Sequence, residues 1–253
     1  MSVADRTSQR TTRKIGKLGK LAPQFPVALK ELHSYTVEPL PAAPAAVDHS
    51  AKVATFPMDG NDKYGDCTMA AAAHLIQSWN ADVDVDMPVP TPTEVVAEYL
   101  KLSRGADNGL VESRVLKTWM ASGLWGNKIS GYAPVNVHNL ESLKKAVAYF
   151  GGVYVGIQVP TNAMDQFQAG EPWSLVADWQ NQGIEGGHAI PILGYDAQWM
   201  YCVTWGAVQK MAWDWWSAYG DEAWVVLSKE YEEAGHPVNG IDIAALKADL
   251  ASI

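Results

Sequence analysis

The chain carries one alanine-rich run beside a cysteine: Gly65-Asp66-Cys67-Thr68-Met69-Ala70-Ala71-Ala72-Ala73-His74-Leu75-Ile76-Gln77-Ser78-Trp79. This composition predicts a helix, because alanine loses the least free energy when it is fixed in one. Asp66 is a suitable N-cap residue, which places Cys67 at the first helical position. The helix dipole favours a thiolate there, while the Asp66 carboxylate opposes a second negative charge. The alternative is a small cysteine buried in a core helix.

A second stretch, far downstream, favours the first alternative, a reactive cysteine. It reads Glu185-Gly186-Gly187-His188-Ala189-Ile190-Pro191-Ile192-Leu193-Gly194-Tyr195. We expect an apolar strand that begins at His188, with Gly187 leaving space for a neighbouring backbone beside the imidazole. A single cysteine and a distant histidine that meet in the fold can form a nucleophile and base pair. The alternative is a histidine with satisfied hydrogen bonds at the end of a sheet.

Both stretches resemble the motifs of the papain-like cysteine peptidases. In that family a glutamine precedes the nucleophilic cysteine by six residues, and the cysteine begins a helix. Its histidine lies on a strand ahead of Gly-Tyr, and an asparagine follows ahead of Ser-Trp-Gly. The resemblance covers roughly residues 50–230 of this chain and rests on two short motifs in the same order.

The resemblance implies a role for several residues of this chain. Cys67 matches the nucleophile and His188 matches the base, while Asn61 stands where the family has its oxyanion-binding glutamine. The binding residues that the motifs imply are Gly65, Asp66, Gly187 and Trp205, with Trp205-Gly206 matching the Trp-Gly pair that covers the family's site.

The chain also departs from the family pattern. Tyr64 replaces a disulfide-bonded cysteine, and Thr68 replaces the tryptophan that usually follows the nucleophile. Val203 stands where the family has its asparagine, so no amide is available to hold the imidazole. Thr204 is the substitute that we predict, and it can reach the imidazole only if its strand shifts by one residue, because such a shift exchanges the two faces.

A further resemblance is to a group of uncharacterised actinobacterial and bacteriophage proteins. The shared patterns are Asn-Asp-x-x-Gly-Asp-Cys-Thr at residues 61–68, Gly-Gly-His at 186–188, Thr-Trp-Gly at 204–206 and Asp-Glu-Ala at 221–223. This resemblance adds a bacteriophage particle protein, such as a minor capsid or accessory protein, to the candidate functions.

Length and composition limit the number of domains, the class of protein and the compartment that this chain can have. The chain has 253 residues, of which 48% are hydrophobic, and this is enough for one large domain or two lobes. No apolar run has the length of a membrane span, and the basic N-terminus is not followed by the hydrophobic segment of a signal peptide. The two cysteines fit a reducing compartment. We therefore expect the host cytoplasm or a virion as the location.

The N-terminal 20 residues differ in charge from the rest of the chain. They contain one acidic residue and six basic ones, whereas the whole chain has a formal charge of −9; the basic residues are Arg6, Arg10, Arg13, Lys14, Lys17 and Lys20. We predict a flexible basic arm at residues 1–20 that binds nucleic acid, an acidic partner in a phage particle, or its own acidic body.

The remaining organisation follows from proline content and periodicity. Residues 21–57 are proline-rich and predict an extended strap that is structural or that covers a cleft, and residues 58–253 predict the papain-like domain. We expect a helical lobe at 58–150 and a β lobe at 151–253, an α+β fold with a mostly antiparallel sheet. The predicted helices are 67–79, 92–103, 110–122, 140–150 and 242–251, with a short one near 214–216, and the predicted strands are 152–159, 188–195, 199–205, 208–213 and 223–227.

Two functions from different classes remain open. The first is a thiol hydrolase in which Cys67 attacks a peptide or isopeptide bond of a peptide or protein substrate, with His188 as base. The second is a non-catalytic, papain-shaped binding or structural module, for example one docked in a phage particle through the arm. A cell-wall amidase of the thiol type is a weaker third option. No metal ligand spacing, phosphate-binding loop or cofactor motif occurs, so we expect neither metal nor cofactor.

Overall fold

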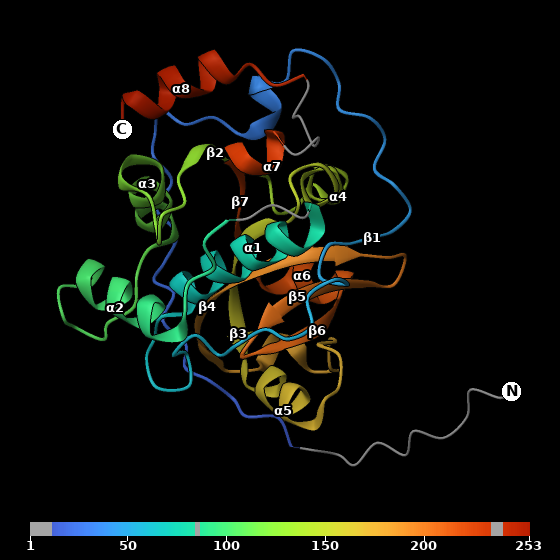
Figure 1. Cartoon of the computed structure of the whole chain (residues 1–253). Coiled ribbons are helices and arrows are strands. Elements are labelled where there is room, and N and C mark those ends of the chain that lie inside the picture. The colour runs from blue at the N-terminus through green and yellow to red at the C-terminus, as the bar shows by residue number, and fades with distance from the viewer. Residues whose placement is uncertain (1–11, 84–86, 234–239) are drawn as a thin grey trace, which may run out of the picture.

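The fold is α+β, with helices packed on a mostly antiparallel sheet, as the sequence predicts (Figure 1). The computed structural model describes residues 12–83, 87–233 and 240–253. In the main path of the sheet, β2 (Ile129–Pro134), β7 (Gly220–Ser228), β3 (Val153–Pro160), β4 (Ile184–Tyr195), β5 (Trp199–Thr204) and β6 (Ala207–Ala212) are neighbours in that order. The short β1 (Val47–Asp48) pairs with β4.

The helices cover this sheet. The predicted cysteine helix is α1 (Cys67–Val83), which packs against β4. The other α-helices are α2 (Pro92–Leu102), α3 (Glu112–Ser122), α4 (Leu140–Tyr149), α5 (Thr161–Ala169), α6 (Trp213–Tyr219), α7 (Lys229–Glu233) and α8 (Ile243–Ala251). The 3-10 turns are η1 (Leu32–Tyr35) and η2 (Trp179–Asn181). In the part of the chain that is described, no helix is both long and apolar enough to cross a membrane.

Local capping residues fix several helix starts. The Thr91 side chain accepts from the amide of Glu94, and the Glu94 carboxylate accepts from the Thr91 amide, so α2 begins with a complete capping box. Asn139 and Asp242 accept from the amides three residues on, at the starts of α4 and α8. These three helix starts agree with the prediction to within one residue.

The sheet departs from the prediction most at β4 and β2, while β7 begins three residues earlier than predicted and β1 was not predicted. Strand β4 begins at Ile184, four residues before His188, because Gly186 and Gly187 pair with β3 rather than forming a loop. Strand β2 lies within residues 58–150, the predicted helical lobe, yet it pairs with β7 at the edge of the sheet. The sheet therefore draws strands from both predicted lobes.

The proline-rich strap forms only short elements. Its η1 turn contacts α8, and β1 pairs with the end of β4 through Val47 opposite Tyr195. Tyr195 also donates from its hydroxyl to the carbonyl of Pro44. These contacts place residues 32–48 of the strap on the body at elements away from Cys67, which favours the structural alternative for that part. At the two ends of the strap, Leu21 donates to the Leu110 carbonyl and the Pro57 carbonyl contacts His74 of α1.

Aromatic packing beneath α1 connects this helix to α3 and to the loop that precedes β3. The Trp79 side chain is fully buried, stacks on Trp119 at 5.8 Å between ring centroids, and donates from Nε1 to the Gly151 carbonyl at 3.1 Å. A Cβ on Gly151 would lie 2.8 Å from the Trp79 ring, and the positive φ of Gly151, 69°, also favours glycine.

We predict that Trp79→Ala lowers the free energy of unfolding by about 3–5 kcal/mol, because a large buried side chain is removed and a cavity remains. Trp79→Phe should cost less, about 1–3 kcal/mol, from the unpaired Gly151 carbonyl. Urea unfolding measures both, with fully exposed Val27→Ala as the control that stays within about 0.5 kcal/mol of wild type. A Trp79→Phe variant as stable as the wild type would contradict the assigned hydrogen bond.

Candidate active site around Cys67

Cys67 lies where the start of α1 meets strand β4. The chain turns before the helix through Asp59 and Gly60, both with positive φ. The Cys67 side chain is 1% exposed, and its Sγ accepts from the backbone N–H of Ala189 on β4 at 3.4 Å. This contact joins the helix start to the strand that carries His188.

His188 is buried beside Cys67 and is held on one side only. Its Nε2 is 2.8 Å from Oγ1 of Thr204, whereas its Nδ1 is buried and has no hydrogen-bond partner among the described residues. The Trp205 ring lies 4.9 Å from the imidazole between centroids. Trp205 has a φ of 45°, the left-handed region that is uncommon for a non-glycine residue.

The register of the sheet explains how Thr204 reaches His188. Strand β4 pairs with β5 as Tyr195 to Met200 and Gly194 to Tyr201, and then as Ile192 to Cys202. The pairing thus shifts by one residue between Ile192 and Gly194, as in a β-bulge. The one-residue shift that the sequence argument requires for Thr204 is present between the hairpin turn and the site.

Most of the predicted site residues lie around one small cavity. Cys67, His188, Asn61, Thr204 and Trp205 all line it. The cavity also contacts His74, whose Nε2 is 3.1 Å from the Asp59 carboxylate and 2.9 Å from the Pro57 carbonyl. The sequence assigns His74 no role, because a histidine seven residues after Cys67 on the helix is more often a core or surface residue than a ligand.

The basic arm enters this site. Figure 1 shows its dark-blue described part starting near α5, and residues 12–21, which we call the cleft segment, continue past Asn61 and β4. The Lys17 N–H donates to the Asn61 carbonyl at 2.6 Å, and the Lys17 carbonyl accepts from Asn61 Nδ2 at 3.0 Å and from Trp205 Nε1 at 3.4 Å. The predicted oxyanion donor therefore already binds a peptide carbonyl.

Beyond Cys67 the cleft segment is bonded on both sides. The Lys20 N–H donates to the Gly187 carbonyl at 3.1 Å, and the Leu21 N–H donates to the Leu110 carbonyl at 3.0 Å. The Leu110 N–H in turn donates to the Gly19 carbonyl at 2.9 Å. We call the space between Leu110 and Gly187 the cleft, and the chain's own segment fills it.

Glycines allow this close approach. A Cβ on Gly19 would lie 1.8 Å from the carbonyl oxygen of Gly65, and one on Gly187 would lie 2.4 Å from the carbonyl oxygen of Lys20. The backbone that uses the space beside Gly65 and Gly187 is thus that of the cleft segment. The N–H of Gly19, like that of Ala189, acts to lower the pKa of the Cys67 thiol.

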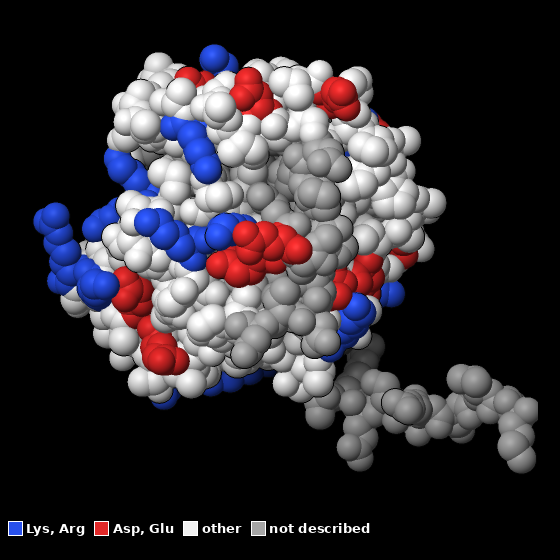
Figure 2. All heavy atoms as spheres, turned by 45° about the horizontal axis from the view of Figure 1, so that its top comes forward, with Lys and Arg blue, Asp and Glu red and all other residues white. Residues whose placement is uncertain are grey.

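Of the three partners considered for the arm, its own body is the one in contact. Lys14 pairs with Asp62 at 2.7 Å, Lys17 pairs with Asp107 at 3.3 Å, and Arg13 donates to Gln209. Arg6 and Arg10 lie outside the described residues. On the face shown in Figure 2, basic and acidic side chains are interspersed, without the continuous basic surface typical of nucleic-acid binding.

Burial controls the charges at the site. It raises the pKa of Cys67 to about 12, against the opposing effect of the N–H groups of Ala189 and Gly19, and it lowers the pKa of His188 to about 3. With the cleft filled, thiol and imidazole are both neutral at pH 7, and the helix start alone does not produce a thiolate.

Asp66 does not cap α1 with its side chain. Its backbone carbonyl accepts from Met69 and Ala70, but its carboxylate accepts from no amide of the first turn. Burial, with Asp59 and Asp107 nearby, raises the pKa of Asp66 to about 8. The predicted N-cap contact is wrong, because the carboxyl group is buried and largely protonated at neutral pH.

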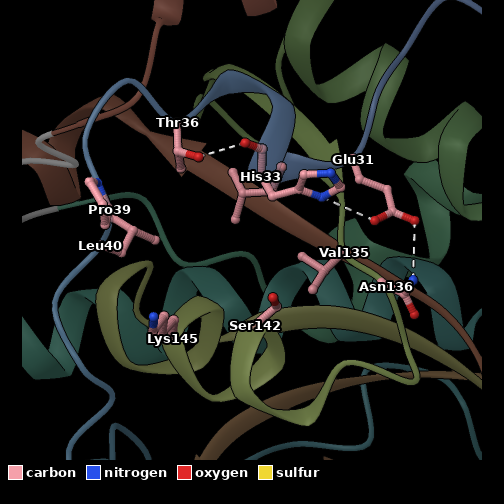
Figure 3. A pocket seen from close by; sticks show the side chains of 10 residues that line it. Glu31, His33, Thr36, Pro39, Leu40, Val135, Asn136, Ser142 and Lys145 are labelled. Atoms are coloured by element: carbon pink, nitrogen blue, oxygen red, sulfur yellow. Dashed lines mark hydrogen bonds and ion pairs between the residues drawn. The ribbon is translucent and has the colours of Figure 1, made fainter.

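A separate pocket lies elsewhere on the molecule, beside η1 and the start of α4 (Figure 3). It contains the His33–Glu31 pair, 3.2 Å apart, with Lys145 and Ser142 on its other side. None of its lining residues lines the cavity at Cys67. Within the described residues, no cluster of His, Cys, Asp and Glu could hold a metal ion.

We predict that Asp66→Asn reduces the loss of stability between about pH 5 and pH 8. The pKa of Asp66 is raised on folding, so the unfolded chain loses this proton first and the folded state becomes less favourable as the pH rises. The wild type should lose on the order of a few kcal/mol more than the variant over this range. Urea unfolding at both pH values measures this difference, and parallel curves would contradict the buried, protonated carboxyl group.

Comparison with known proteins identifies the fold. No family model matches the chain, and no curated protein matches it. Xylellain, a cysteine protease from Xylella fastidiosa, matches with a TM-score of 0.67 at 17% identity, over 88% of this chain and 99% of that one. Procathepsin B from Trypanosoma congolense matches with a TM-score of 0.55 at 11% identity, over 87% of this chain and 88% of that one. Digestive procathepsin L 3 from Tenebrio molitor matches with a TM-score of 0.55 at 12% identity, over 86% and 77%. The chain therefore has the fold of the papain-like cysteine proteases.

Proposed function

We propose that this protein is a thiol hydrolase that cleaves peptide or isopeptide bonds and is kept latent by its own cleft segment. The observation that supports the proposal most is the hydrogen bonding of the two His188 ring nitrogens. One ring nitrogen is held by Thr204, and the other is unpartnered in a cavity shared with Cys67. A base that must take a proton from a nucleophile needs one oriented nitrogen and one free nitrogen.

The chemistry follows from these positions. Cys67 Sγ attacks the carbonyl carbon of the substrate, and its proton passes to Nδ1 of His188. The imidazolium then protonates the leaving amine as the bond breaks, which leaves a thioester that water hydrolyses with His188 again as base. Thr204 Oγ1 accepts from Nε2–H and holds the tautomer in which Nδ1 can accept.

Asn61 stabilises the negative charge that develops on the carbonyl oxygen of the substrate. Its Nδ2 donates to the Lys17 carbonyl, which shows that this amide can reach a peptide oxygen in the cleft. The backbone N–H of Cys67, in the first turn of α1, is the second donor that we assign. The shorter asparagine thus takes the place of the family's glutamine.

The cleft segment is bound in a way that avoids its own cleavage. The group that meets the sulfur is the N–H of Gly19, while the carbonyl held by Asn61 belongs to Lys17, two residues earlier. The burial that this segment causes also keeps the thiol and imidazole neutral. Displacement of the segment admits water, which favours the thiolate–imidazolium pair.

The alternative is a non-catalytic module of the same fold. It is favoured by one observation: the hydrogen bond to Cys67 Sγ comes from the backbone N–H of Ala189 and not from the imidazole of His188. The solved structures of this fold named above are described as proteases or their proforms, which supports the hydrolase. Docking in a phage particle, and a location in the host cytoplasm or a virion, remain predictions from the sequence.

We predict that displacing the cleft segment in the full chain releases activity. Gly19→Ala and Gly16→Ala each place a Cβ against fixed atoms, 1.8 Å from the Gly65 oxygen and 2.3 Å from the Trp205 ring respectively. Both variants should hydrolyse fluorescent casein at least about 10-fold faster than wild type, and adding Cys67→Ser should abolish the gain.

The control variant is Lys14→Ala, which removes an exposed ion pair of the same segment and should leave the protein latent. Proteolytic nicking within residues 12–21 reports whether the segment has left the cleft. A displaced segment without Cys67-dependent hydrolysis, and with Cys67 alkylated only at the pH of an ordinary thiol, would establish the non-catalytic module.

A further inference from the structure

The side chain of Lys20 is buried completely, in an acidic pocket beside the cleft. Its Nζ lies 3.0 Å from the Asp221 carboxylate and 2.9 Å from the Glu222 carboxylate, and its side chain is 0% exposed. Its backbone pairs with Gly187, next to His188. The pocket is therefore adjacent to the residues assigned to catalysis.

The acidic groups of the pocket are held in place by the body. Gln158 donates to the Asp221 carboxylate, and Trp224 Nε1 donates to the Glu222 carboxylate at 2.9 Å. Glu112, at the start of α3, is fully buried, and neither of its carboxylate oxygens has a hydrogen-bond partner among the described residues. The body thus presents two ion-paired carboxylates to Lys20, and the buried Glu112 acts on the same charge from beyond ion-pair distance.

A glycine makes room for the lysine stem. A Cβ on Gly156 would lie 1.9 Å from Lys20 Cε and 2.6 Å from the Asp221 carboxylate. Gly156 pairs with Ala189 on one side and Glu222 on the other, at the point where the pairing of β3 with β7 shifts its register, and its φ is not in the left-handed region. The φ of Gly156 does not require glycine. The absence of a side chain at this position instead leaves the space that the Lys20 side chain fills.

Without a cation, the buried carboxyl groups of this pocket would destabilise the folded protein. Buried carboxyl groups need a partner or a proton, and removing one member of a buried ion pair leaves an uncompensated charge. Burial, with Asp221 nearby, raises the pKa of Glu222 against the opposing effect of Lys20, and Glu112, Glu222 and Asp221 raise the pKa of Lys20 against the effect of its burial. When the cleft segment leaves, the pocket is complementary to another long, unbranched side chain that ends in an ammonium group.

We propose that Glu112, Gly156, Asp221 and Glu222 form a specificity pocket that binds a lysine side chain of the peptide substrate once Lys20 has left it. This inference rests on the proposed hydrolase function, since it assigns the substrate of that site. The substrate class is a peptide or protein segment with a lysine close to the bond that is cleaved.

Binding tests the pocket without catalysis. The probe is a labelled peptide with the sequence of residues 12–21, and the receptor is the full chain with Gly19→Ala to empty the cleft and Cys67→Ser to prevent cleavage. Norleucine in place of the lysine at position 20 keeps the stem and lacks the ammonium group, and it should weaken binding at least about 10-fold.

Two matched controls identify the pocket as the cause. Norleucine at position 17 should change binding far less, because Lys17 pairs at the surface with Asp107 and is half exposed. Gly156→Ala in the receptor should remove the preference for lysine at position 20. Equal binding of the lysine and norleucine peptides by the unmodified pocket would overturn the proposal.

Cleavage distinguishes this inference from the proposed function. The Gly19→Ala chain with Cys67 intact is given pairs of peptides that differ only in lysine against norleucine. Faster cleavage of the lysine peptides supports both conclusions, and equal cleavage of each pair overturns the lysine pocket alone. Absence of cleavage with a retained lysine preference in binding contradicts the hydrolase and leaves the pocket established.

Discussion

The hydrogen bond from the Ala189 N–H to Cys67 Sγ joins the helical part of the molecule to the sheet. Three consecutive residues of β4 meet there: Gly187 binds the cleft segment, His188 binds Thr204, and Ala189 binds the sulfur. Because alternate residues of a strand face opposite sides, this arrangement depends on the register of β4 against β3 and β5. A one-residue slip would separate the imidazole from both of its neighbours.

The same strand order builds the acidic pocket. Gly156 of β3 lies between Ala189 of β4 and Glu222 of β7, so the strand with the sulfur contact and the strand with the acidic residues flank the same residue of β3. The cleft segment therefore binds two features at once: backbone groups near Cys67 and a buried ion-paired side chain beside them. Its order comes from these contacts, since its own sequence contains little that would form regular structure.

Sequence reasoning predicted the local features best. The helix starts at residues 92, 140 and 242 and the Cys67 helix follow from short-range patterns, and each is present to within one residue. Strand β2 was missed because Gly131 and Pro134 are typical of loops, although pairing with β7 outweighs that preference. The start of β4 was placed late for a similar reason, since a glycine pair is typical of a turn.

At the site, the sequence predicted that Cys67 and His188 share one environment, and they line one cavity. It did not predict the lysine pocket, because Lys20, Glu112, Gly156 and Glu222 come from four distant segments with no common pattern. The Asp-Glu-Ala pattern at residues 221–223 was visible, yet nothing local indicated its cation. The arm was predicted to be flexible because lysine and glycine are typical of solvated tails.

Native-state amide hydrogen exchange tests most directly whether the cleft segment occupies the cleft. The amides of Lys17, Lys20 and Leu21 donate to Asn61, Gly187 and Leu110 of the body. We predict that these three amides exchange at least about 100-fold more slowly than in the isolated peptide of residues 12–21. Exchange at the rate of the free peptide would show that the cleft is open and would contradict the account of a latent site.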